Sequence, residues 1–152
     1  MCVGADPARI ALLDNFCWPS CDDPAQLGSL VRAATACYDG ALAYHCPFVS
    51  GKDSLNNQFT TSDHRVITIP QTLLITAVGI VNDCHRCITM DAKAPGNLLL
   101  VVGRTTADLG GSHLHLLTGE RGQISRVDLN TGPATAAAVA RLIGRASCRE
   151  RV

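Results

Sequence analysis

The run Ile10-Ala-Leu-Leu-Asp-Asn-Phe16 decides the fold, because a short apolar segment with turn-forming polar residues near its end predicts a buried strand entering a loop. Pro19 lies in that loop. Asp23 followed by Pro24 predicts a helix start, with an acidic N-cap and a proline at the first helical position. Pro47 ends the helix, since the residue before a proline is disfavoured in helical conformation. A buried strand followed by a long helix is therefore expected here.

The predicted helix carries one apolar stripe over about six turns. Apolar or interfacial side chains recur at three- and four-residue steps, at Leu27, Leu30, Val31, Ala34, Tyr38, Ala41, Leu42 and His45. This spacing predicts that the stripe faces the core, with His45 at the helix end.

Further strands and helices are expected along the rest of the chain. The expected strands cover residues 48–50, 65–69, 72–81, 88–90 and 98–102. Of these, 72–81 and 98–102 are nearly all apolar, which predicts burial on both faces. A helix is expected to open within residues 108–115, and another covers 133–142. Strands and helices mix without regular alternation, which predicts the α+β class.

The composition limits what the protein can do. The chain has 152 residues, 47% hydrophobic and 17% charged, as in globular proteins. Thirteen lysines and arginines balance thirteen aspartates and glutamates, so no charged surface for nucleic acid or an anionic membrane is expected. The apolar runs fall well short of the ~20 residues that a membrane helix needs. We therefore expect a cytoplasmic protein with neither kind of partner.

The chain is expected to hold parts of two domains, residues 1–90 and 91–142, because turn-forming residues cluster at 91–97. The last ten residues, Ile143–Val152, read like a translated sequencing adapter and are set aside as a non-native tail. The abrupt start, which enters a strand almost at once, indicates a fragment at both ends.

The eight cysteines favour reduced thiols, because they lie in core-forming segments without a secretory signal. Cys17-x3-Cys21 and Cys84-x2-Cys87 nevertheless resemble zinc half-sites. A non-catalytic, cysteine-rich zinc module therefore stays open as an alternative.

The residues Gly51-Lys52-Asp53-Ser54 follow a predicted strand and combine a glycine, a cation, a carboxylate and a hydroxyl. They are not a P-loop, because Cys46 and Asp53 occupy positions that need glycine and Ser or Thr. The set suits a phosphate with its Mg²⁺, and a polar turn with a solvated Lys–Asp pair is the alternative. Asp14 has an alternative as a loop-capping residue.

His113 and His115 are expected to share one face of a strand, in packing or at the surface. As a metal pair they would lack a third ligand.

Five blocks, in order along the chain, carry a family likeness: Val3–Trp18, Pro47–Asn57, Leu73–Val81, Pro95–Gly103 and Leu109–Ser112. Together they resemble phosphoribosylformylglycinamidine synthase, the synthetase of the fourth step of purine biosynthesis. The likeness covers residues 3–142. It implies an aminoimidazole-ribonucleotide-synthetase-like fold, in which the end of an N-terminal-type domain joins the start of a C-terminal-type domain. Another synthetase of the same superfamily is the alternative.

The resemblance also implies a reaction and its partners. ATP phosphorylates the amide oxygen of formylglycinamide ribonucleotide, and ammonia from a glutaminase subunit or domain displaces the phosphate, with Mg²⁺ assisting. Asp14 and Gly51 match nucleotide contacts, and Ser54 matches a substrate contact. The family's catalytic histidine lies in a first half that this chain lacks, so no catalytic residue is assigned and the chain alone should be inactive.

Lys52 stands where many small-form members of the family place an Mg²⁺-binding asparagine. A lysine has no lone pair for the metal when charged. Asp53 is therefore the nearest candidate to take that role.

Overall fold

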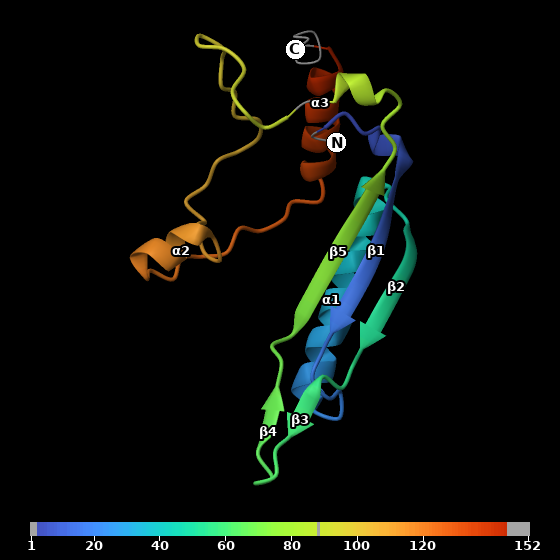
Figure 1. Cartoon of the computed structure of the whole chain (residues 1–152), viewed down its shortest axis with the longest axis vertical. Coiled ribbons are helices and arrows are strands. Elements are labelled where there is room, and N and C mark those ends of the chain that lie inside the picture. The colour runs from blue at the N-terminus through green and yellow to red at the C-terminus, as the bar shows by residue number, and fades with distance from the viewer. Residues whose placement is uncertain (1–2, 88, 146–152) are drawn as a thin grey trace.

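The computed structural model describes residues 3–87 and 89–145. Its elements are η1 (Pro7–Arg9), β1 (Ile10–Cys17), α1 (Pro24–Tyr44), β2 (Phe48–Ser54), β3 (Gln58–Thr60), β4 (Val66–Thr68), β5 (Thr72–Gly79), η2 (Cys84–Arg86), α2 (His113–Thr118) and α3 (Gly132–Arg145) (Figure 1). No helix among these residues is long and apolar enough to cross a membrane. The mixture of strands and helices is compatible with the α+β class.

A three-stranded sheet with the order β2-β1-β5 organises the first half of the chain. The central strand β1 runs parallel to β2 and antiparallel to β5, and α1 connects β1 to β2 along one face of the sheet (Figure 1). The short strands β3 and β4 form a separate antiparallel pair. The predicted strand at 65–69 is thus confirmed as β4, whereas β3 had not been predicted.

The ends of α1 confirm the predicted start and stop signals. The Asp23 carboxylate accepts a hydrogen bond of 2.9 Å from the Ala25 N–H, and Pro24 occupies the first turn. At the other end, His45 adopts a left-handed conformation with φ 53°, and its N–H bonds to the carbonyl oxygens of the last turn. His45 is therefore a helix C-cap, as its position at the end of the stripe predicted.

Asp23→Ala is expected to lower the free energy of unfolding by about 1 kcal/mol, because the Ala25 N–H loses its acceptor. Urea denaturation followed by helical circular dichroism measures this change. Asp22→Ala is the matched control, since the Asp22 side chain accepts only from the loop residue Ser20. Equal losses in the two variants would contradict a capping role for Asp23.

Only part of the predicted stripe of α1 faces the sheet, since Ala34, Tyr38 and Ala41 line cavities against it. Leu27, Val31 and Tyr38 are 46%, 57% and 65% exposed. A neighbouring stripe of mostly small residues, which shares Ala41 with the predicted one, lines a cavity of about 470 Å³ against β1 and β5: Ala33, Ala36, Cys37, Gly40, Ala41 and Tyr44. The expectation was wrong in part because two apolar stripes lie side by side on this helix, and the one with smaller side chains lets it approach the sheet.

The prediction that residues 72–81 are buried on both faces is also wrong. Leu73, Ile75 and Ala77 line the cavity beneath α1. Their neighbours Leu74 and Val78, on the opposite face, are 59% and 55% exposed. Successive side chains of a strand point to opposite faces, and α1 covers one face of this sheet.

The buried core lies at the carboxyl end of β1. Phe16 and Trp18 are 8% and 4% exposed, and their ring centroids lie 5.6 Å apart. The Trp18 indole N–H donates to Ser29 Oγ over 2.9 Å, which joins the strand end to the first turns of α1. This contact closes the loop between strand and helix.

The second part of the chain contains α2 and α3 but not the expected strands. Residues 98–102 form no strand, and Leu98 and Leu99 are 85% and 95% exposed. Apolar, β-branched sequence becomes a strand when a partner strand satisfies its backbone, and β-propensity depends on that context. Of the strand expected at 88–90, Thr89 and Met90 are not in a strand, and residue 88 lies outside the described residues.

His113 and His115 lie in α2, so the expectation that they share a strand face is wrong. Two residues apart on a helix, they lie on different faces. The final helix α3 runs from Gly132 to Arg145, beyond the predicted end at residue 142. Residues 146–152 of the suggested tail lie outside the described residues, and the division into domains 1–90 and 91–142 stays a prediction.

Candidate functional site

Asp14 and Gly51 lie directly opposite each other on the parallel strands β1 and β2. A Cβ atom built on Gly51 would lie 2.6 Å from Asp14 Cγ, closer than non-bonded atoms approach. The absence of a side chain at position 51 therefore leaves the room that the Asp14 carboxylate occupies. The two residues predicted as nucleotide contacts are thus brought together.

A β-bulge in the pairing creates this contact. The register shifts between Leu12 and Leu13, which pair with Phe48 and Ser50. Without the shift, Asp14 would lie opposite Ser50. The bulge thus places the carboxylate beside a glycine.

The four residues at 51–54 belong to β2 and not to a loop after it, so the expected flexible turn is wrong. Because Cα partners on parallel strands share a face, Asp53 lies with Phe16 on the α1 side, together with Asp14 and Gly51. Lys52 and Ser54 lie on the other face, opposite Asn15 and Cys17.

The separation of faces argues against the alternative, a polar turn with a solvated Lys52–Asp53 pair. The Lys52 ammonium donates instead to Ser54 Oγ. One face therefore carries two carboxylates, and the other carries a cation with a hydroxyl.

Asp14 lines a cavity of about 320 Å³ between the sheet and α1, with Phe16, Tyr38 and Phe48. It lies within β1, so the alternative of a loop-capping residue is wrong. Cys37 lines the same cavity, and burial, followed by the negative charge of Asp14, raises the pKa of its thiol. The negative field on this side suits cations and hydrogen-bond donors.

Asn57 is a residue of this region to which the sequence assigned no role. Its side-chain amide donates to the Ser54 carbonyl over 2.8 Å, and its backbone N–H donates to the Trp18 carbonyl over 2.9 Å. The Trp18 N–H in turn donates to the Ser54 carbonyl over 2.8 Å. Asn57 thus fixes the end of β2 against the end of β1. Asn57 is the last residue of Pro47–Asn57, one of the five blocks that carry the family likeness, and this position could have indicated its importance.

The two cysteine pairs considered for zinc lie at opposite ends of the sheet. Cys17 ends β1 and pairs with Thr72, whereas Cys84 follows the other end of β5, where Gly79 pairs with Ile10. Eight strand residues span roughly 26 Å, far beyond the reach of one tetrahedral site. In residues 3–87 and 89–145 no three His, Cys, Asp or Glu side chains gather into a metal site.

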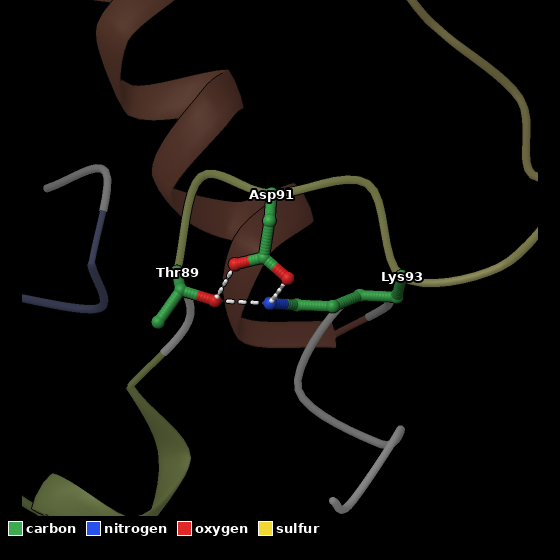
Figure 2. Close-up of polar contacts among 3 residues, drawn as sticks. All are labelled: Thr89, Asp91 and Lys93. Carbon is green, nitrogen blue, oxygen red and sulfur yellow. Dashed lines mark hydrogen bonds and ion pairs between the residues drawn. The ribbon is translucent and has the colours of Figure 1, made fainter.

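A polar cluster outside the predicted site joins Thr89, Asp91 and Lys93 (Figure 2). The Lys93 ammonium lies 2.7 Å from Asp91 Oδ2 and also donates to Thr89 Oγ1, which donates to Asp91 Oδ1. These hydrogen bonds, first that from Lys93 and then that from Thr89, lower the pKa of Asp91 from 3.8 to about 2. All three residues are close in sequence, so the cluster orders a local turn.

The pH dependence of this turn follows from the lowered pKa. Its stabilisation is complete above pH 3.8 and is lost as the pH falls through about 2. We expect the Asp91 carboxyl carbon to titrate near pH 2 by NMR, and Lys93→Met to move that midpoint up toward 3.8. Lys52→Met, at a distant lysine, should leave it unchanged. A midpoint near 3.8 in the unaltered chain would contradict the cluster.

Known synthase subunits are similar in sequence to this chain. Phosphoribosylformylglycinamidine synthase subunit PurL of Gloeobacter violaceus is 37% identical over 111 residues, which are 73% of this chain and 14% of the relative. The PurL subunit of Thermococcus sibiricus is 34% identical over 128 residues, 84% of this chain and 17% of the relative. That of Deinococcus radiodurans is 33% identical over 136 residues, 85% of this chain and 18% of the relative. No family model matches the chain.

These relatives define the class, since each is a subunit of a synthase. The chain belongs to the phosphoribosylformylglycinamidine synthase family, and the relatives that establish this are its PurL subunits. The resemblance seen in the sequence is thereby confirmed. The chain spans 14% to 18% of the length of these curated relatives.

Proposed function

We propose that this chain is the part of an ATP-dependent ligase of purine biosynthesis that carries one of its nucleotide contacts. The parent protein converts formylglycinamide ribonucleotide to formylglycinamidine ribonucleotide in the cytoplasm, with ammonia from a glutaminase partner. Family membership and the Asp14–Gly51 contact across β1 and β2 support this proposal. The remaining domains of the parent supply the catalytic histidine, so the chain alone makes no product.

Asp14 and Gly51 contact the nucleotide in this proposal, and the chemistry of both residues suits this role. Asp14 accepts hydrogen bonds from ribose hydroxyls or amino groups, because a carboxylate is an acceptor and this one lines the cavity between the sheet and α1. Gly51 has no side chain and so leaves room for the Asp14 carboxylate beside β2, where that carboxylate is available to the nucleotide. ATP supplies the phosphoryl group that activates the substrate amide.

Asp53 is the proposed Mg²⁺ ligand, and the donor set fits the metal. Mg²⁺ prefers oxygen ligands and uses one or two carboxylates together with substrate phosphates. Asp53 and Asp14 share the α1 side of adjacent strands. Ser54 is the proposed substrate contact, and Lys52 beside it adds a positive charge that suits the phosphate of a ribonucleotide. Asp53 and Ser54 are the last two residues of β2, so the two sets lie near the same end of this strand, on opposite faces.

The ATP assignment is tested in the full-length synthase. Asp14→Asn should raise the KM for ATP about tenfold or more, because a hydrogen bond to a charged group contributes about 1.5–3 kcal/mol. Asp39→Asn, on the exposed side of α1, is the matched control. Unchanged ATP kinetics in Asp14→Asn would remove the assignment. Failure to form the amidine product in the unaltered enzyme would remove the synthase function itself.

The metal assignment is tested separately, by the Mg²⁺ concentration that half-saturates the activity. Asp53→Asn should raise it about tenfold or more, since even outer-shell partners contribute that much to metal affinity. Lys52→Asn should leave it unchanged, because Lys52 lies on the opposite face of β2. A changed Mg²⁺ requirement in Lys52→Asn would instead place position 52 in the metal site.

A further inference from the structure

Cys84 and Cys87 form a cysteine pair that the proposed function does not use. Cys84 is the first residue of η2, the short 3₁₀ helix that follows β5, and Cys87 is the C-cap of this helix. Both are exposed, whereas Cys17, Cys21, Cys37 and Cys46 are half-buried. The solvent therefore reaches these two thiols more readily than the four half-buried ones.

Hydrogen bonds of the η2 turn hold Cys84 and Cys87 close to each other. The Cys87 N–H donates to the Cys84 carbonyl over 3.2 Å, and the Asp83 carboxylate caps the turn by accepting from the His85 N–H over 3.0 Å. Cys84 begins this 3₁₀ turn and Cys87 is its C-cap, so a rise of about 2 Å per residue separates their Cα atoms by about 6 Å. A disulfide spans Cα distances of about 4.4–6.8 Å. This separation falls within the range that a disulfide spans.

The other candidate pair lacks this arrangement. Cys17 ends β1, and its thiol donates to Asn15 Oδ1, whereas Cys21 lies in the loop, and its thiol bonds to the Pro19 carbonyl. Because each of these thiols has its own acceptor and only one of them lies in a strand, Cys17 and Cys21 are poorly placed to form a disulfide. The chain thus contains its own control.

We propose that Cys84 and Cys87 are a redox-active dithiol site that exchanges with low-molecular-weight disulfides such as oxidised glutathione. One thiolate attacks a glutathione sulfur, forming a mixed disulfide and releasing one glutathione thiolate. The second cysteine thiolate attacks the protein sulfur of that mixed disulfide and releases the other glutathione. Two electrons pass from the cysteines to glutathione, and their two protons end on the released thiols. The site is independent of the proposed synthase function.

The location gives the oxidation a structural consequence. η2 connects β5, which pairs with the strand that holds Asp14, to the turn ordered by Thr89, Asp91 and Lys93. A disulfide would close this connection covalently, whereas hydrogen bonds hold the reduced turn, among them that from the Cys87 N–H to the Cys84 carbonyl and that from the His85 N–H to the Asp83 carboxylate.

The test uses the whole 152-residue chain in glutathione buffers of increasing oxidised fraction, followed by acid quenching, alkylation and trypsin. Trypsin cleaves after Arg86, between the two cysteines, so a disulfide would join the peptides 66–86 and 87–93. We expect this linked pair, lighter by two hydrogens than the sum of the free peptides. Peptide 10–32, which holds Cys17 and Cys21, should stay doubly alkylated under the same conditions.

Two variants make the result decisive. Cys84→Ser should trap one glutathione on Cys87 and abolish the link, whereas Cys17→Ser should leave the link intact. Recovery of the two peptides unlinked at every glutathione ratio would overturn the proposal. Protection of both thiols by added Zn²⁺, without a link in glutathione, would also overturn it and identify a metal site instead.

Discussion

Gly51→Val is expected to lower the free energy of unfolding by about 1–3 kcal/mol and to abolish the nucleotide contact. The first methyl-sized atom at position 51 would already overlap the Asp14 carboxyl group, which occupies the space beside β2. Either the carboxylate rotates away or the two strands separate, and both outcomes displace Asp14. Urea denaturation of the chain measures the first effect, and the KM for ATP in the full-length synthase measures the second.

A second substitution separates the clash from other effects of valine. In the double variant Asp14→Ala/Gly51→Val the overlapping carboxylate is gone, so stability should recover relative to Gly51→Val alone. ATP affinity should not recover, because the contact is missing. Gly40→Ala is the matched glycine control, since a Cβ there meets nothing within 4 Å. Strict additivity of the two substitutions would contradict the contact.

Trp18→Ala is expected to cost about 3–5 kcal/mol, which is a large part of the stability of a small domain. Trp18 is 4% exposed, packs on Phe16 and links the start of α1 to the end of β2 through its indole and backbone. Loss of the ring therefore opens the core at its centre. Loss of the cooperative unfolding transition, followed by circular dichroism in urea, is the expected result.

Graded variants divide this effect into its parts. Ser29→Ala removes the acceptor of the indole N–H and should cost about 1 kcal/mol. Trp18→Phe keeps an aromatic ring and should fall between the two. A small loss in Trp18→Ala, no greater than in Ser29→Ala, would show that the core does not depend on this side chain.

The sequence predicted those elements whose signals are local. The strand at 10–16 and the helix after Asp23 were confirmed, because a proline and an N-cap act on their own neighbours. The strand at 98–102 was wrong, because a strand depends on partners that the local pattern does not specify.

The resemblance named the residues of the candidate site, whereas only the structure gives their geometry. Asp14, Gly51 and Ser54 were found by resemblance, and Asp14 and Gly51 do lie together. The separation of Lys52 from Asp53 by the sheet was not foreseen, because it depends on β2 continuing through Ser54. The bulge beside Leu12 sets the register between β1 and β2, and no local sequence pattern predicts this bulge.

The order of strands in the sheet has a consequence for synthesis on the ribosome. The central strand β1 emerges first, but its two neighbours follow much later, with Cys17 paired to Ser54 on one side and Thr72 on the other. One edge of this apolar strand therefore stays open until β2 has left the exit tunnel, and the other until β5 has left it. Such non-local pairing slows folding. The nascent chain can misassociate through these unpaired edges during this interval. The helix α1 forms early from local contacts and is the first element that can cover the apolar strand.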